Sequence, residues 1–175
     1  QRCFNFVIFC LSFLVVADGR SAFAKDDYDV EPILYSTATP HDPISVLQQR
    51  LEAGKTQLEF EERHGYLKSV LKQLAVPVAS QVLVVSKTSL QIRHIEPRSP
   101  RAIYFNDDVY IGWVQGGDVL EVSAVDPQLG AMFYTLDQTQ SEKPRFERAT
   151  HQCLQCHVSR KTQDVPGHLV RSLYT

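Results

Sequence analysis

Five consecutive residues near the C-terminal end of the chain have the types and the spacing needed for chemistry: Cys153-Leu154-Gln155-Cys156-His157. Two thiols separated by two residues lie about one helical turn apart, and an imidazole follows them directly. Each thiol can form a thioether bond with a vinyl group of a haem, and the imidazole can then ligate the haem iron. The C-x-x-C-H spacing therefore predicts one covalently attached haem, held by Cys153 and Cys156, with His157 as the proximal iron ligand.

A pair of cysteines at this spacing also occurs in zinc sites, redox dithiols and disulfides. A structural zinc site needs four ligands, but the only other cysteines, Cys3 and Cys10, lie in a hydrophobic leader. Zinc would have to recruit His157 together with His168 or His151, at unusual spacing. A redox dithiol follows a strand in a βαβ unit, whereas this motif follows a predicted meander. Haem attachment is thus favoured over a zinc- or disulfide-stabilised binding module, which remains as a third hypothesis.

Residues 1–24 have the features of a secretory signal peptide. A basic residue precedes an apolar run over 4–17, and Ala22 and Ala24 put small residues at the −3 and −1 positions before Lys25. The apolar run is shorter than the roughly 20 residues of a membrane span. We therefore expect a periplasmic or otherwise exported protein, attached to a membrane only if the leader is uncleaved.

Removal of this leader would leave the two motif cysteines as the only thiols, which agrees with haem attachment outside the cytoplasm. The chain starts with Gln1 rather than Met, so we expect it to be part of a longer reading frame. Residues 25–41 are predicted to form an extended lead-in. Residues 42–175 are then long enough for a single domain, in which 139–175 carry the haem.

Charge is spread unevenly along the predicted mature chain. Residues 25–142 contain 10 basic and 17 acidic residues, whereas 143–175 contain 6 basic and 2 acidic ones. The basic end suits pairing with haem propionates or with an acidic redox partner, or is an ordinary solvated surface. The net charge of −2, the isoelectric point of about 6.3 and the lack of a basic run argue against nucleic-acid binding.

Hydrophobic periodicity predicts an α+β fold that begins with two helices. Asp42-Pro43 is typical of a helix start, with an aspartate cap and proline at the first helical position. A second helix is expected over 58–74, where apolar residues recur at helical spacing. His64 lies within that apolar stripe, where a histidine is either a hydrogen-bonded core residue or a metal ligand.

The middle of the chain has the alternation and the turn residues of strands. The candidate strands cover 81–87, 90–95, 102–105, 109–115, 119–125 and 131–137. The last four are separated by short segments rich in Asn, Asp and Gly, which predict an antiparallel meander of four to six strands. Its aromatic residues, among them Tyr110, Trp113 and Phe133, suit either a core or the wall of a haem pocket. Residues 146–158 are expected to form the haem-bearing helix at the C-terminal end.

A six-coordinate iron would need a second axial ligand in addition to His157. His168 follows it by 11 residues, a stretch that extends to roughly 35 Å, and Pro166-Gly167 supplies a bend. We therefore predict His168 as the distal ligand in preference to Met132, which lies at the start of a predicted strand. His64 is the reserve candidate.

The C-x-x-C-H motif resembles that of c-type cytochromes, which implies haem c as the cofactor and electron transfer with a redox partner protein or a small electron donor or acceptor. The motif lies near the C-terminus, unlike that of the small all-helical cytochromes. A β-rich domain with this layout resembles the cytochrome P460 and cytochrome c′-β group. That resemblance implies the alternative, a haem enzyme or gas sensor with an open iron site, including peroxidase-like chemistry. We expect an electron carrier, and no catalytic residue is assigned.

Three further segments resemble those of uncharacterised exported bacterial proteins with a haem motif. They are His64-Gly65-Tyr66-Leu67, the stretch from Tyr104 to Tyr110, and the stretch from Val165 to Ser172. The resemblance implies an exported cytochrome-like protein and no particular activity.

Overall fold

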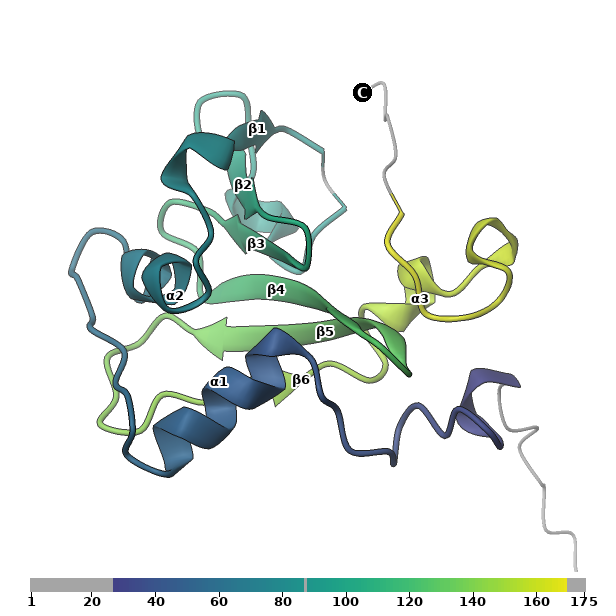
Figure 1. Cartoon of the computed structure of the whole chain (residues 1–175). Helices are drawn as coiled ribbons and strands as arrows, with labels where there is room; N and C mark the ends of the chain where they lie inside the picture. The colour runs from purple at the N-terminus through teal and green to yellow at the C-terminus, as the bar shows by residue number, and fades with distance from the viewer. Residues whose placement is uncertain (1–26, 87, 170–175) are drawn as a thin grey trace, which may run out of the picture.

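The computed structural model describes residues 27–86 and 88–169, and the predicted leader lies outside them. Six strands form one antiparallel sheet in chain order (Figure 1). The strands are β1 (Val82–Val84), β2 (Arg101–Phe105), β3 (Val109–Trp113), β4 (Val119–Asp126), β5 (Gly130–Asp137) and β6 (Phe146–Arg148). The α-helices are α1 (Pro43–Glu52), α2 (Leu67–Gln73) and α3 (Leu154–His157), and the 3-10 turns are η1 (Asp27–Asp29), η2 (Val78–Ser80), η3 (Ile92–His94) and η4 (Arg160–Thr162). The predicted α+β class and antiparallel meander are confirmed.

Tight turns determine this strand order. Between β2 and β3, the side-chain oxygen of Asn106 accepts hydrogen bonds from the backbone N–H groups of Asp108 (3.0 Å) and Val109 (2.8 Å). The next two turns contain Gly116 and Gly130 at φ angles of +70° and +76°, a region that glycine enters without steric cost. Because such short links leave adjacent strands only an antiparallel arrangement, β2 to β5 form a simple meander.

The sheet has two faces, since successive side chains of a strand point to opposite sides. On the first face, Ile111, Val122 and Tyr134 of three neighbouring strands are directly paired and buried. A row of directly paired residues crosses the other face, and we call it the second-face row: Phe105, Tyr110, Ser123 and Phe133. The first face therefore presents buried apolar side chains, whereas the second face presents a row of three aromatic residues and a serine.

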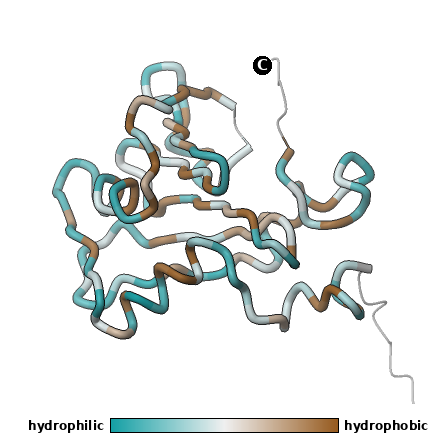
Figure 2. Tube along the Cα trace, in the orientation of Figure 1, coloured by the Kyte–Doolittle hydropathy of each residue, from teal (hydrophilic) through white to brown (hydrophobic). Residues whose placement is uncertain are grey.

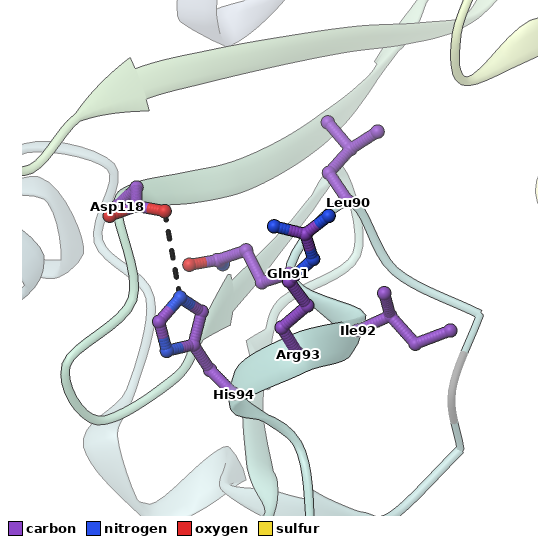
Figure 3. Close-up of a pocket in the computed structure, with 6 residues that line it drawn as sticks. All are labelled: Leu90, Gln91, Ile92, Arg93, His94 and Asp118. Atoms are coloured by element: carbon purple, nitrogen blue, oxygen red, sulfur yellow. Dashed lines mark ion pairs between the residues drawn. The ribbon is translucent and has the colours of Figure 1, made fainter.

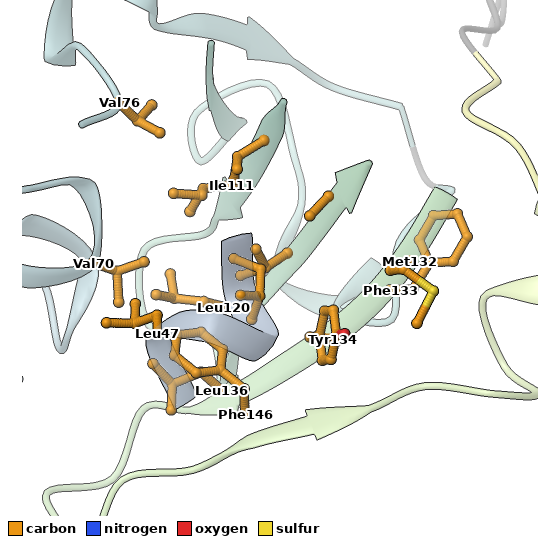
Figure 4. Packing of buried hydrophobic residues seen from close by; sticks show 14 of the residues in the cluster. Leu47, Val70, Val76, Ile111, Leu120, Met132, Phe133, Tyr134, Leu136 and Phe146 are labelled. Carbon is orange, nitrogen blue, oxygen red and sulfur yellow. The ribbon is translucent and has the colours of Figure 1, made fainter. Parts of the chain in front are cut away.

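Helices α1 and α2 contribute to the hydrophobic core on the first face. Leu47 of α1, Val70 of α2 and Leu120 of β4 are buried in one cluster. Figure 4 shows Leu47 and Val70 next to Leu120. Burial of each such side chain contributes about 1.5–3 kcal/mol relative to exposure. Figure 2 shows hydrophobic residues recurring along the central strands and the helices, while most connecting loops are hydrophilic. The core thus lies between the helices and the sheet.

Asp42 fixes the start of α1 to the sheet. Its Oδ1 accepts hydrogen bonds from the backbone N–H groups of Ile44 (2.8 Å) and Ser45 (3.2 Å). Its Oδ2 accepts a third, of 2.5 Å, from the hydroxyl of Tyr134 in β5. Because Asp42 is fully buried, these bonds offset the cost of taking its carboxylate out of water.

The second helix is shorter than the 58–74 expected from the apolar stripe. Only Leu67–Gln73 is helical, because Glu61 and Gly65 exchange two backbone hydrogen bonds that close a turn instead. Gly65 has a φ angle of +57°, and a Cβ there would lie 2.0 Å from Oε1 of Gln138. Glycine is therefore required at this turn, and a continuous helix through it is excluded.

The C-terminal segment also departs from its predicted helix over 146–158. Phe146 pairs with Leu136 and opens β6, so the helical part is reduced to α3. The expected strand over 90–95 is wrong as well, because this stretch contains the 3-10 turn η3. In both places an apolar residue at a suitable spacing was compatible with helix and strand, and tertiary contacts decided between them.

The segment before α1 packs onto the sheet, rather than leading in as an extended chain. Tyr35 is fully buried and donates a 2.8 Å hydrogen bond from its hydroxyl to the carbonyl of Ala131. The guanidinium of Arg148 lies 4.9 Å from the centre of the Tyr35 ring and donates to the Tyr35 carbonyl. Within the described residues, no helix has both the length and the apolar character to cross a membrane.

Candidate functional site

The motif cysteines and His157 lie on a single helical turn. Cys153 is the N-terminal cap of α3 with helical backbone angles, φ −69° and ψ −36°. Its carbonyl accepts hydrogen bonds from the backbone N–H groups of Cys156 (3.1 Å) and His157 (3.0 Å). Cys153 packs against the core, Cys156 is exposed, and both thiols are free. In Figure 1 this turn lies at the end of the sheet opposite α2.

A backbone carbonyl orients the His157 imidazole. Its Nδ1 lies 3.0 Å from the carbonyl oxygen of Gly167, which can only accept a hydrogen bond. Nδ1 therefore carries the proton in this contact, and Nε2 carries the lone pair that a metal ligand needs. Histidines that ligate metals almost always have such a partner for their second nitrogen. The ring centre of His157 is 4.5 Å from that of Phe133 in the second-face row.

The loop over 158–167 folds back onto His157 and supplies that carbonyl. Besides accepting from the imidazole, Gly167 donates its N–H to the His157 carbonyl at 3.0 Å. Pro166 is buried, and its carbonyl oxygen lies 3.3 Å from where a Cβ of Gly130 would be. The loop is thus held between the motif and the turn that begins β5.

His168 follows this loop and lies on the second-face row. Its Nε2 is 3.0 Å from Oγ of Ser123, and its ring centre is 5.0 Å from that of Tyr110 and 6.0 Å from that of Phe133. The residue is exposed to solvent, yet the packing of its ring against these neighbours, followed by the charge of His157, lowers the pKa of His168. A neutral imidazole is the form that ligates a metal.

Phe133 is the residue that both histidines contact. The row continues beyond His168, since the rings of Tyr110 and Phe105 stack with centres 6.0 Å apart and planes at 22°. Phe133 itself is buried, whereas Tyr110 and Phe105 are exposed. A line of ring contacts therefore runs from His157 across the second face to Phe105 of β2.

Burial raises the pKa of the Cys153 thiol to about 11, with smaller contributions from the charges of Glu121 and Cys156. Glu121 is itself paired with Arg101, whose Nη1 lies 2.9 Å from Oε2 of Glu121, and it accepts a 2.9 Å hydrogen bond from Ser89. Cys153 is therefore a protonated thiol at neutral pH, rather than a reactive thiolate of a redox dithiol.

The other predicted ligand candidates lie elsewhere. The ring of His64 is 5.7 Å from that of Trp113, which belongs to the first face, and His64 Nδ1 contacts Glu61 at 3.3 Å. Met132 is fully buried and also faces the core side, because it neighbours Phe133 along β5. The fold thus brings His168, but neither His64 nor Met132, to the face that carries His157.

Comparisons of the chain with protein-family models, with curated proteins and with solved structures gave no match. Any function must therefore be argued from the geometry of the site itself.

Shallow hollows lie at two places in the described part of the chain away from the motif thiols. One, of about 350 Å³, is lined by residues 90–94 and Asp118, with Nε2 of His94 3.5 Å from Oδ2 of Asp118 (Figure 3). The other, of about 330 Å³, lies between Tyr28 and α3 and is lined by His151, Leu154, Gln155 and Val158. Among residues 27–86 and 88–169, no three His, Cys, Asp or Glu side chains gather as a metal-binding group.

Sequence reasoning found the three motif residues and His168, but it missed Ser123 and Gly167 as their partners. Ser123 interrupts an apolar run in β4, a signal that its side chain faces away from the core. Nothing in the sequence indicates that this hydroxyl contacts His168, because the contact depends on where the C-terminal loop packs on the sheet.

Proposed function

We propose that this chain is an exported c-type haem protein that carries one covalent haem and serves electron transfer. The observation that carries the proposal is the orientation of His157: its Nδ1 is held by the Gly167 carbonyl, on the same helical turn as two free cysteines. This is the arrangement that a proximal histidine needs in order to present Nε2 to an iron.

The residues around the motif fit a haem in their chemistry. Cys153 and Cys156 supply two thiols for thioether bonds, and His157 supplies a neutral nitrogen ligand. The aromatic second-face row offers an apolar surface beside them. A site of four clustered protein ligands, as structural zinc requires, has no equivalent among the described residues.

When bound, a haem supplies a one-electron iron couple, and the protein sets its potential through axial ligands and burial. In this chain His157 would hold the iron from one side, and Gly167 would keep its imidazole in the correct tautomer. His168 would serve as the second ligand only after Gly167 leaves His157, and its lowered pKa would keep it neutral for that role. Phe133 would exclude water from the space beside both imidazoles.

A second candidate function, binding of an external ligand at an open iron position, is supported by one contact. Nε2 of His168 is engaged by Ser123, so this nitrogen is not committed to iron ligation. Gas binding or oxidation of a small substrate would require this open state. Spectra of the ferric protein separate the two: a low-spin iron supports electron transfer, and a high-spin iron supports ligand binding.

The proposal is tested on the full chain, expressed with its leader in a host that has haem-attachment machinery. We expect the mass of the exported protein to include one haem, and its spectrum in alkaline pyridine to be that of a haem with two thioether bonds. Cys153→Ser and Cys156→Ser should each give the shifted spectrum of a single thioether, and the double variant should retain no covalent haem. His151→Ala, just outside the motif, is the matched control and should behave as wild type.

Haem that extracts into acidified organic solvent, or an exported chain without added mass, would refute the proposal. Zinc bound in stoichiometric amount to that chain would instead favour the binding-module hypothesis.

A further inference from the structure

The segment that leads into η3 is anchored to β4 by hydrogen bonds. The N–H of Leu90 donates to Oε1 of Glu121 at 2.6 Å, and the hydroxyl of Ser89 donates to the same carboxylate at 2.9 Å. Oε1 of Gln91 accepts from the N–H of Val119 at 3.4 Å. The backbone around η3 is therefore held against the first half of β4.

The hollow of about 350 Å³ beside this segment lies away from the cysteine motif, and we call it the η3 hollow. It is lined by Leu90, Gln91, Ile92, Arg93, His94 and Asp118. Its volume is at the low end of the range of small-molecule sites. Figure 3 shows the side chains of Gln91, Arg93 and His94 extending from the segment toward the start of β4, where Asp118 lies.

Two hydrogen-bond donors of the η3 hollow have no acceptor among the described residues. Gln91 is only 4% exposed, and its Nε2 is buried without a hydrogen-bond partner. The guanidinium of Arg93 is exposed and forms no ion pair within the described part of the chain, and the dashed line in Figure 3 joins His94 to Asp118 instead. Because a buried amide donor without an acceptor is costly, the hollow favours a ligand that brings acceptor oxygens.

A carboxylate is the group that matches these donors. A guanidinium binds both oxygens of a carboxylate through its planar fork, and an amide N–H donates to the same oxygens. The terminal torsion of a glutamine side chain has a broad energy minimum, so the Gln91 amide can turn its Nε2 toward the hollow. Leu90 and Ile92 are 44% and 47% exposed, which leaves an apolar surface beside the donors.

We propose that the η3 hollow binds a small organic carboxylate, with the carboxylate group held by Arg93 and Gln91 and the apolar part resting on Leu90 and Ile92. This is a binding function beyond the proposed haem, and it does not depend on the haem, because the hollow contains no residue of the motif.

Asp118 is a carboxylate that also lines the hollow, and its charge opposes an anionic ligand. Its Oδ2 lies 3.5 Å from Nε2 of His94, and its side chain is 86% exposed, so solvent screens this charge. Asp118→Asn should therefore tighten the binding of a carboxylate only about 2- to 3-fold.

The experiment uses the full exported chain and isovalerate, a small branched carboxylate, with the Kd measured by calorimetry. We expect a Kd of about 1 mM. Isovaleramide has the same shape without the charge and should bind at least about tenfold more weakly. Acetate lacks the branched apolar part and should bind about fivefold more weakly.

Three substitutions and a matched control assign the binding to these residues. Arg93→Ala should raise the Kd of isovalerate at least about tenfold, and Arg93→Lys, which keeps the charge without the fork, should raise it less. Gln91→Met fills a similar volume without a donor and should raise it about 3- to 10-fold. Arg98→Ala, at an exposed arginine after η3, should leave it unchanged, and the midpoint of urea unfolding checks that each variant is folded.

A second readout locates the ligand. Phenylglyoxal modifies accessible guanidinium groups, and peptide mass spectrometry gives the rates at Arg93 and Arg98 in the same sample. Isovalerate should slow the modification of Arg93 and leave that of Arg98 unchanged. Unprotected Arg93, equal binding of isovalerate and isovaleramide, or an equal Kd in Arg93→Ala and Arg98→Ala overturns the inference. Covalent haem is measured separately by the mass of the same protein, so failure of this inference and failure of the proposed function are distinguishable.

Discussion

The two cysteines of the motif have different surroundings, although only two residues separate them. Cys153 packs against the core, and its thiol pKa is raised to about 11, mainly by burial and then by the charge of Glu121. Cys156 is exposed on the outer side of the same turn. A motif that is symmetric in sequence is therefore chemically asymmetric in the folded, haem-free chain.

This asymmetry predicts unequal alkylation of the haem-free protein. A shift from the ordinary value of 9.0 to about 11 lowers the thiolate fraction of Cys153 about 100-fold, and only the thiolate reacts. With iodoacetamide at pH 8, we expect Cys156 to be modified at least about tenfold faster than Cys153, as measured by peptide mass spectrometry. The difference should vanish in concentrated urea, and equal rates in the folded protein would contradict it.

His168 provides a prediction of pH dependence. Its pKa in the folded chain is lowered from 6.5 by burial of its ring and by His157, so the unfolded state binds more protons in the acidic range. Its contribution to stability is therefore fully present above pH 6.5, and it is lost as the pH falls from 6.5 through the lower pKa of the folded state. Titration of the haem-free protein by NMR should give a His168 midpoint below 6.5. A midpoint equal to that in urea would contradict this prediction.

At the scale of elements, the sheet was predictable because its information is local. The turn residues around Asn106, Gly116 and Gly130 pair each of the strands β2 to β5 with its neighbour in the chain. The segment containing Gly65 was not predictable, because the apolar stripe over 58–74 fits a continuous helix and does not reveal the turn that Glu61 and Gly65 close beside Gln138. Strand β6 was also not predicted from the sequence, because its pairing of Phe146 with Leu136 is a tertiary contact.

Asp42 joins an element to the sheet, and its substitution tests that link. Asp42→Ala removes the cap of α1 and leaves the buried hydroxyl of Tyr134 without its acceptor. We expect a loss of about 2–4 kcal/mol in the free energy of unfolding, measured by urea denaturation. Asp42→Asn retains a capping oxygen and should lose less. Val46→Ala, at an exposed position of α1, is the control, and an effect of Asp42→Ala no larger than this control would refute the link.

At the scale of the whole molecule, the core and the candidate site share residues. The first face holds most of the core with α1 and α2, whereas the second face meets His157 and His168, and Phe133 belongs to the core cluster while contacting both histidines. The motif itself could be found from sequence because its three residues are contiguous. Its surroundings could not, since Ser123 and His168 meet across 45 residues through the combined register of the strands and the C-terminal loop.

The predicted leader is the last feature of the whole chain to test, and it lies outside the described residues. Ala22 and Ala24 fit the small-residue positions of a cleavage site, and Lys25 opens a polar segment. We expect the exported protein to begin at Lys25. Tyr35, which packs onto the sheet, is then kept in the mature chain.

Two measurements check this cleavage. N-terminal sequencing of the exported protein should start at Lys25. Thiol titration of the denatured, haem-free protein should find four cysteines in the precursor but only Cys153 and Cys156 after processing, because Cys3 and Cys10 leave with the leader. A protein that fractionates with membranes and still reacts at Cys3 would show that the leader is retained as an anchor. In that case the motif turn would lie at a membrane surface, and any partner of the proposed haem would have to be sought there.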